Sequence, residues 1–302
     1  MQSVSVVVST YTTERLQDVL KCILSLGKQT LRPAEIILVL DPSETLFRDY
    51  RSRVPAHVKV ISSDKMGLSS ARNVGIMKAE GEIVAFVDDD AIADKRWLEN
   101  LVKLYSDPLV MGVGGSAVAN WEVGQPEWFP EELNWIVGCS YRGLPTRRSF
   151  VRNPIGCNMS FRKGVFRKVG YFRLDIGRFG KMLLSKEETE LSIRVLKGIP
   201  NSRIVYEPQA IVYHRVSAKR ASLKYIWLRS FYEGISNDLI SSESEPAPAL
   251  SAEASYLRYL IRVAIPSRLA RIYSFKAAAQ LLILALSMSA VSAGFISSKL
   301  RR

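Results

Sequence analysis

The first hundred residues alternate between two hydrophobic patterns, and this alternation restricts the fold more than any other feature of the chain. Strand-like runs, rich in apolar residues, occur at residues 4–9, 35–40, 57–62 and 83–88. Helical periodicity fills the intervals, at about 14–28, 43–52 and 67–79. Strands and helices in this order form successive β-α-β units, whose parallel strands share one sheet covered by helices. The sequence therefore predicts an α/β fold with a nucleotide-binding half.

Three consecutive aspartates, Asp88, Asp89 and Asp90, directly follow the fourth strand pattern. Adjacent carboxylates repel one another, so their position at a strand end favours a site that a cation neutralises. In open α/β sheets, ligands bind beyond the carboxyl ends of the strands. Mg²⁺ or Mn²⁺, held by carboxylates and phosphate oxygens, would place a diphosphate here. The alternative is a solvated acidic turn that caps a helix beginning near Ala93.

The middle of the chain, residues 110–175, loses the alternation and is rich in Trp, Gly, Pro and Arg. Its tryptophans recur every seven residues, but prolines interrupt the helical interpretation of that spacing. We therefore expect loops and short elements that could form the floor of a pocket. Regular elements are predicted again further on, as helices at 186–198 and 221–239 and a strand at 203–207.

Positive charge is concentrated in two stretches of this chain, whose formal net charge is +13. Residues 142–168 contain no acidic residue, and none occurs after Glu253. Such stretches attract phosphates, nucleic acid or anionic lipid headgroups, and charge alone does not choose among them. The apolar content of 47% is ample for a core, which excludes disorder of the whole chain.

The C-terminal segment changes character after a linker predicted at 241–255, which is rich in Ser, Glu, Pro and Ala. Residues 256–275 mix arginine with apolar side chains and predict a basic amphipathic helix, interrupted at Pro266, on an anionic membrane surface. Residues 277–298 carry no charge and are long enough to span a bilayer. An oligomerisation helix or a helical hairpin remains an alternative for this last segment.

The cysteines do not have the spacing of metal ligands, and we interpret them as reduced packing residues of a cytoplasmic protein. These are Cys22, Cys139 and Cys157. The chain opens directly into a strand pattern, so no signal peptide is expected.

Four ordered motifs, at residues 6–11, 35–41, 67–75 and 86–90, together resemble family 2 glycosyltransferases of the GT-A fold. The resemblance continues through later segments and covers about residues 3–235. Within the family, the segments around Trp135, Arg152 and Glu187 resemble archaeal glucuronosyltransferases that extend dolichyl-phosphate-linked glycans.

The resemblance implies a GT-A domain at 1–240, with a mixed sheet flanked by helices. Its nucleotide-binding half would be 1–110 and its acceptor half 111–240. The linker at 241–255 would join it to a helical membrane-association region at 256–302.

The resemblance also implies that a UDP-sugar donor binds at the strand ends. The residues expected to contact the nucleotide sugar are Thr10, Tyr11, Glu14, Asp41, Asp64, Arg72, Asp88 and Asp89. Asp90 would bind Mn²⁺ or Mg²⁺, with His214 as a further ligand. Structural alternatives stay open for four of these residues. Asp41 could belong to a turn before Pro42, and Glu14 could support the first turn of its helix. Arg72 could form an ion pair with the triplet, and His214 could be a hydrogen-bonded structural histidine.

Inverting glycosyl transfer needs a base that takes the proton from the acceptor hydroxyl, and a carboxylate with a raised pKa suits this task. Glu188 is the expected base and Glu187 the reserve, although both could simply favour the start of a helix. The resemblance places the acceptor in the second half of the domain. Candidate contacts there are Trp135, which could stack on a sugar, Arg152, which could bind a donor carboxylate, and Asn158.

The sequence thus predicts a metal-dependent inverting glycosyltransferase at the cytoplasmic face of the cell membrane. It would move a sugar, with glucuronic acid as a candidate, from UDP to a polyprenyl- or dolichyl-phosphate-linked saccharide. The expected partners are this donor, this acceptor and membrane lipids, but not nucleic acid, and a homo-oligomer is left open. One alternative is a dolichyl-phosphate sugar synthase that acts on the bare lipid phosphate. Another is a basic lipid- or nucleic-acid-binding protein, which would not explain an acidic triplet at a strand end.

Overall fold

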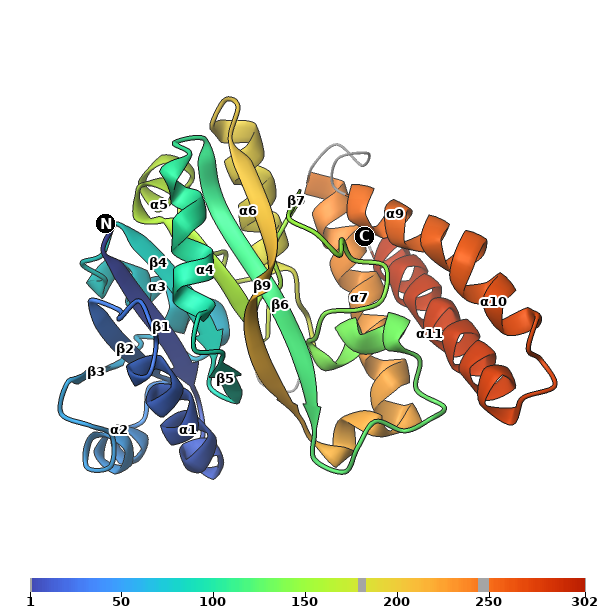
Figure 1. Ribbon diagram of the computed structural model, residues 1–302, viewed down its shortest axis with the longest axis horizontal. Helices are drawn as coiled ribbons and strands as arrows, with labels where there is room; N and C mark the ends of the chain where they lie inside the picture. Colours follow the sequence, from blue (N-terminus) through green and yellow to red (C-terminus); the bar gives the residue numbers. More distant parts are fainter. Residues whose placement is uncertain (1, 179–182, 244–249, 302) are drawn as a thin grey trace. The chain divides into compact units, whose positions relative to one another are not determined.

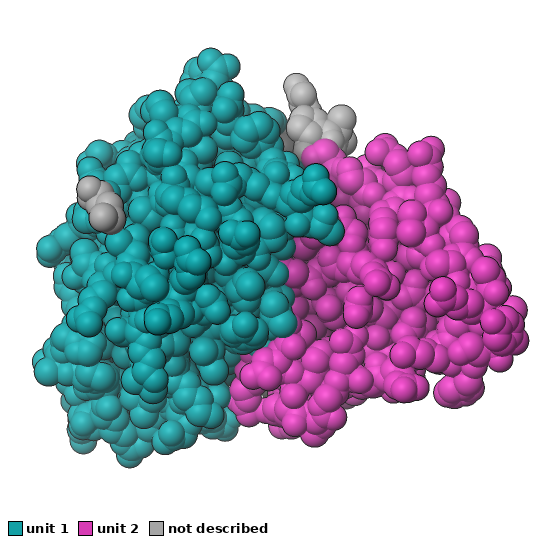
Figure 2. All heavy atoms as spheres, in the orientation of Figure 1, with its two compact units in different colours: residues 1–118, 145–181, 187–214 teal, residues 119–144, 182–186, 215–302 magenta. Residues whose placement is uncertain are grey.

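The computed structural model describes residues 2–178, 183–243 and 250–301 (Figure 1). In this part of the chain, nine strands form one sheet in the order β3-β2-β1-β4-β8-β6-β9-β5, and β7 pairs with β9. The chain divides into two compact units, shown in separate colours in Figure 2. Unit 1 comprises residues 1–118, 145–181 and 187–214, and unit 2 comprises residues 119–144, 182–186 and 215–302.

Unit 1 begins with four parallel strands, as the alternation predicts. They are β1 (Val4–Thr10), β2 (Glu35–Leu40), β3 (Val58–Ser62) and β4 (Ile83–Asp88). β1 lies between β2 and β4, and β3 is the edge strand beyond β2. The helices between them are α1 (Leu16–Gly27), α2 (Glu44–Arg51) and α3 (Leu68–Lys78). These observations confirm the predicted strands and helices to within two residues at every end.

Alternate residues of the strands pack into two separate cores. Val6 and Val8 of β1 belong to a core with α1, α2 and α4 (Trp97–Val102). Val7, between them, belongs to the opposite core with α3, α5 (Lys163–Val169) and α6 (Glu187–Gly198). Helices therefore cover both faces of the sheet, and this explains why the strands carry apolar residues on both faces rather than on one.

The prediction of loops and short elements over residues 110–175 is wrong at its start, where β6 (Val110–Trp121) forms a strand of 12 residues. Its glycines look like strand breakers, but close packing requires them. A Cβ added to Gly115 would lie 1.9 Å from the Ala210 carbonyl oxygen, and one added to Gly114 would lie 2.4 Å from Pro154 Cβ. The other strands are β5 (Ala91–Ala93), β7 (Ser149–Phe150), β8 (Asn158–Arg162) and β9 (Arg203–Val216), the last being longer than predicted.

Unit 2 contains the C-terminal helices. They are α7 (Leu223–Glu243), α9 (Ser251–Tyr259), the π-helical turn η5 (Leu260–Ala264), α10 (Ile265–Leu269) and α11 (Phe275–Leu300). Residues 244–249 of the predicted linker lie outside the described residues, and α9 begins before that linker was expected to end. The predicted interruption at Pro266 is wrong, because η5 runs directly into α10. Pro266 cannot donate to a carbonyl of the preceding turn, and the π-helical hydrogen-bond pattern of η5, directly before it, accommodates this loss.

The core of unit 2 encloses an ion pair. Arg268 Nη2 lies 2.6 Å from Glu132 Oε2, and Glu132 is buried. Arg268 Nη1 also donates to Glu132 Oε1 at 3.1 Å, so the pair is bidentate. One of the C-terminal arginines is therefore bound within the protein rather than available to an outside anion.

A second buried charge cluster in unit 2 holds Lys186, the residue directly before α6. Lys186 Nζ lies 2.9 Å from Glu233 Oε1 and also contacts Glu253, while Arg229 Nη1 lies 2.9 Å from Glu233 Oε2. Burial opposes ionisation of Glu233, but the charges of Lys186 and Arg229 outweigh it and hold its pKa at about 2. The stability that this carboxylate contributes is therefore present above its ordinary pKa of 4.5 and is lost as the pH falls towards 2.

Glycines allow α7 and α11 to pack closely. A Cβ added to Gly234 would lie 2.0 Å from the Val291 carbonyl oxygen, and one added to Gly294 would lie 1.9 Å from the Phe231 carbonyl oxygen. The hydroxyls of Ser230 and Ser287 share a hydrogen bond of 2.8 Å. Backbone thus meets backbone at this crossing, with no space for a larger residue.

We expect Gly294→Ala to destabilise the protein by about 2 kcal/mol or more, because the helices must separate to admit the methyl group. The measurement is thermal or urea unfolding. The matched control is Gly27→Ala at the end of α1, where an added Cβ meets no atom within 4 Å. Its stability should stay the same or rise by up to about 1 kcal/mol through helix propensity. Equal effects of the two substitutions would contradict the close crossing.

Candidate functional site

The carboxyl ends of the parallel strands of unit 1 lie next to each other. Ser9 of β1 pairs with Asp88 of β4, and Thr10 of β1 pairs with Leu40 of β2. Figure 1 shows these neighbouring strands. The residues after these three strands therefore meet at one edge of the sheet, where ligands of α/β proteins bind. The strand ends at which the sequence predicts donor binding therefore lie side by side.

The aspartate triplet faces a histidine from a distant strand. β5 pairs antiparallel with β9, and Ala91 lies opposite His214. His214 Nε2 lies 3.2 Å from Asp90 Oδ1 and 3.7 Å from Asp88 Oδ2. His214 and Asp90 are buried, whereas the side chain of Asp88 is 32% exposed. The structure thus brings together the two predicted metal ligands, with Asp88 as the more accessible neighbour.

This donor set fits a divalent cation. The carboxylates of Asp90 and Asp88 lie 3.2 Å and 3.7 Å from the imidazole Nε2 of His214. Mn²⁺ and Mg²⁺ accept carboxylate ligands, and Mn²⁺ also accepts imidazole. Burial opposes ionisation of Asp88, but the hydrogen bond from His214 and the charge of Arg72 outweigh it and hold its pKa below the ordinary value. Asp88 is therefore ready to bind a cation as a carboxylate.

Arg15 is a member of this cluster that the sequence analysis missed. It ends the short helix η1 (Thr13–Arg15) after β1, and its Nη1 lies 2.6 Å from Asp89 Oδ1 and 3.3 Å from Asp90 Oδ2. Burial raises the pKa of Asp89 to about 6 even beside this guanidinium. Arg15 also lies over the ring of Tyr11, 5.3 Å from its centroid. The structure therefore gives Asp89 a partner inside the protein and shows how the triplet is held.

Arg72 of α3 forms a bridge between the triplet and α6. Its Nη1 lies 2.7 Å from Glu187 Oε1, and its Nη2 lies 3.5 Å from Asp88 Oδ1. Nη2 also donates to the Gly156 carbonyl oxygen at 2.8 Å. Both Arg72 and Glu187 are buried. The ion pair that the sequence left open for Arg72 is therefore present.

Glu188 begins α6 beside Glu187 but is less buried. Thr189 Oγ1 donates to Glu188 Oε1 at 3.1 Å. A Cβ added to Gly156 would lie 3.6 Å from both Glu188 Oε2 and Arg72 Nη2. The Glu188 carboxylate and the Arg72 guanidinium therefore meet at the same backbone segment.

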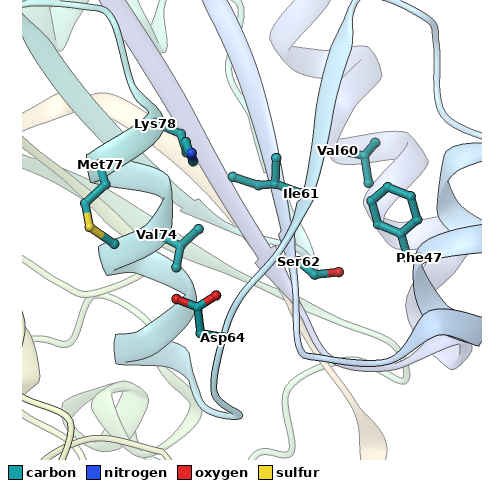
Figure 3. Close-up of a pocket in the computed structure, with 8 residues that line it drawn as sticks. All are labelled: Phe47, Val60, Ile61, Ser62, Asp64, Val74, Met77 and Lys78. Atoms are coloured by element: carbon teal, nitrogen blue, oxygen red, sulfur yellow. The ribbon is translucent and has the colours of Figure 1, made fainter.

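Three further predicted contacts lie near the ends of β1, β2 and β3. The Asp41 carboxylate accepts the Gly67 N–H at 3.2 Å, and burial raises its pKa. Glu14 is exposed within η1. Asp64 lines a hollow of about 560 Å³ at the edge strand, where Figure 3 shows side chains from both sides of β3. Its other lining residues are Phe47, Val60, Ile61, Ser62, Val74, Met77 and Lys78, so the hollow does not include the triplet.

The predicted acceptor residues have separate surroundings. In unit 2, Trp135 Nε1 donates to the Tyr256 hydroxyl at 3.3 Å, and in unit 1, Arg152 Nε donates to Asn153 Oδ1 at 2.9 Å. Asn158 is completely buried. Its Oδ1 accepts from Trp97 Nε1 at 2.7 Å, and its Nδ2 donates to two carbonyl oxygens at 2.8 Å, those of Ser116 and Ala210. These bonds join strands of the sheet and hold the Asn158 side chain within the core.

The comparisons with known proteins agree on the class. Residues 5–170 match the family model "Glycosyl transferase family 2". The chain is 33% identical over 303 residues to the glucosyl-dolichyl phosphate glucuronosyltransferase of Haloferax volcanii, which covers 97% of this chain and 95% of the relative. The chain therefore belongs to glycosyltransferase family 2 and is a glycosyltransferase.

Two solved structures have the same fold. The mannosyltransferase PcManGT from Pyrobaculum calidifontis, in complex with GDP-Man and Mn²⁺, aligns with a TM-score of 0.62 over 98% of this chain and 87% of that one, at 18% identity. GalNAc-T7 with UDP, GalNAc and Mn²⁺ aligns with a TM-score of 0.52 over 87% of this chain and 57% of that one, also at 18% identity. The predicted GT-A fold is confirmed.

Proposed function

We propose that this glycosyltransferase moves a sugar, with glucuronic acid as the first candidate, from UDP to a dolichyl- or polyprenyl-phosphate-linked saccharide. The observation that carries the chemistry is the convergence of Asp88, Asp90 and His214 at the strand ends. The similarity to the Haloferax volcanii relative over nearly its whole length supports this choice of donor and acceptor.

In the proposed complex, Asp90 and His214 would hold Mn²⁺ or Mg²⁺, and Asp88 is the neighbouring carboxylate. The bound cation supplies charge stabilisation for the diphosphate as UDP leaves. Arg15 pairs with Asp89 and contacts Asp90, which offsets the repulsion among the three adjacent carboxylates. Thr10, Tyr11, Asp41 and Asp64, at or just beyond the ends of β1, β2 and β3, are the proposed nucleoside contacts, together with Glu14 of η1.

Glu188 is the proposed base. Glu187 is occupied by its short ion pair with buried Arg72, which leaves Glu188 as the more accessible carboxylate at the start of α6. Glu188 would accept the proton of the acceptor hydroxyl as that oxygen attacks the anomeric carbon. Glu187 and Arg72 are then positioning residues, because they fix the start of α6 relative to Asp88. Trp135 and Arg152 stay as proposed contacts for the acceptor or the donor sugar.

The C-terminal helices carry the proposed membrane contact. Exposed apolar side chains gather along the segment from α9 to the start of α11: Leu257, Ile261, Val263, Leu269, Ile272, Tyr273 and Phe275. Exposed basic side chains alternate with them: Arg258, Arg262, Arg271 and Lys276. This combination suits the interface of an anionic membrane, where apolar groups enter the headgroup region and cations meet phosphates.

α11 is long and apolar enough to cross a membrane, but we propose that it lies at the surface. It packs along α7 within unit 2, and its Ser298 donates to Asp238 Oδ2 of α7 at 2.7 Å. If α11 crossed the bilayer while packed against α7, it would draw α7 into the hydrocarbon, and α7 contains several charged residues. We expect alkaline carbonate to release the protein from membranes, and retention in the membrane pellet would show instead that α11 spans it.

The proposed function is tested by measuring UDP release from a panel of UDP-sugars with Mn²⁺ and a lipid extract containing glycosylated dolichyl phosphates. UDP-glucuronic acid should give turnover that EDTA abolishes and Mn²⁺ restores. Turnover with a GDP- or dTDP-sugar, and with no UDP-sugar, would overturn the donor class.

A further inference from the structure

Cys157 lies close to Asp88 and His214, although the sequence predicted only a packing role for it. β8 pairs antiparallel with β4, and Val87 lies opposite Asn158. Cys157 directly precedes Asn158 and Asp88 directly follows Val87, so the two residues flank this last pair of the ladder. Cys157 is buried, and its segment follows Gly156, whose carbonyl oxygen accepts from Arg72. Sheet register, rather than sequence spacing, therefore delivers a thiol to the site.

The thiol, the Asp88 carboxylate and the imidazole of His214 form a compact set of three donors. One ligand atom from each of these residues lies within 4.8 Å of the other two. In a tetrahedral zinc site, bonds of about 2.0–2.3 Å separate neighbouring ligand atoms by roughly 3.5 Å. The distance of 3.7 Å between His214 Nε2 and Asp88 Oδ2 is already close to this value. Small side-chain movements would complete the geometry.

We propose that Cys157, Asp88 and His214 form a site for a thiophilic divalent cation of the Zn²⁺ class. This inference deepens the proposed function, since Asp88 and His214 also belong to the proposed donor-metal site. Carboxylate and water oxygens suit Mg²⁺ and Mn²⁺, whereas a sulfur and an imidazole favour Zn²⁺ and Co²⁺. Binding deprotonates the thiol and releases that proton to solvent, with no change of oxidation state.

The consequence is a competition at one centre. A thiophilic cation held by Cys157 takes His214 and Asp88 away from the cation that serves the UDP diphosphate. The affinity order of divalent metals places Zn²⁺ above Mn²⁺ for such donors, so low concentrations of Zn²⁺ displace Mn²⁺. The sulfur thus determines which metals the protein accepts.

Titration of the metal-free protein with Co²⁺ tests the proposal, because a thiolate bound to Co²⁺ gives a charge-transfer absorption band in the near ultraviolet. The wild-type protein should show this band, and Cys157→Ser should lose it. Cys139→Ser and Cys22→Ser are matched controls that should keep it, since these buried cysteines are not in the donor set. Absence of the band in the wild type overturns the proposal whether or not Cys157→Ser folds, and so does a band that persists in Cys157→Ser.

The readout does not depend on turnover, so failure of the proposed function can be told apart. If no UDP-sugar is turned over but the band appears and depends on Cys157, the cation site stands and the proposed function fails. If UDP-glucuronic acid is turned over with Mn²⁺ and no band forms, the proposed function stands and the thiophilic site fails.

Discussion

Glu188→Gln should lower kcat for transfer to the saccharide acceptor by about 10²–10⁴-fold, because the amide cannot accept the hydroxyl proton. UDP-sugar binding should change little, since the cation ligands and the strand-end contacts are untouched. The measurement is steady-state turnover together with UDP-sugar titration. Glu190→Gln is the matched control on the same helix, where the Glu190 carboxylate pairs with Arg194 at 2.6 Å, and its kcat should stay within a few-fold of the wild type.

The same variant separates saccharide transfer from synthesis of a dolichyl-phosphate sugar. A lipid phosphate is already ionised and needs no base, so a synthase would retain its activity in Glu188→Gln. Undiminished kcat with the control unchanged would therefore contradict the role of Glu188 and favour the bare phosphate as acceptor.

Asp90→Asn is expected to weaken Mn²⁺ binding by about 100-fold or more, since changes to groups that only support a ligand already cost 10–100-fold. Turnover should fall with it and recover only partly at high Mn²⁺. The fold should persist, because the substitution removes one of three adjacent negative charges. Mn²⁺ titration and UDP release are the measurements. Asp94→Asn is the control. The Asp94 carboxylate accepts the Arg96 N–H at 3.0 Å, and its replacement should leave the Mn²⁺ affinity unchanged.

Equal Mn²⁺ affinity in Asp90→Asn and the wild type would show that the cation is held elsewhere. Asp88 Oδ2 remains beside His214 Nε2 at 3.7 Å, and Asp88→Asn would then become the decisive variant.

Local patterns were sufficient for the parallel half of the fold. The strands and helices of the first hundred residues follow from hydrophobic periodicity, because the period of the apolar residues in each segment reports its local conformation. The triplet at the end of β4 was found for the same reason, since it directly follows an apolar run. The π-helical turn before Pro266 was missed because proline alone cannot show how the preceding turn will adapt.

The rest of the site depends on pairing between segments far apart in the sequence. Cys157 meets Asp88 only because β8 inserts antiparallel beside β4, and no spacing rule predicts that register. β6 was missed because its glycines signal a loop until the close approach of Ala210 and Pro154 is known. Arg15 carried a usable signal, since a basic residue shortly after the first strand could have been matched to the acidic triplet.

The most direct measurement is mass spectrometry of the lipid formed by the purified protein with Mn²⁺ and UDP-glucuronic acid. The acceptors should be a glycosylated dolichyl phosphate and bare dolichyl phosphate, offered in separate reactions. We predict that the glycosylated lipid gains one hexuronic acid residue and that the bare phosphate is unchanged. Addition of the sugar to the bare phosphate, or no addition to either lipid, would contradict the proposed function.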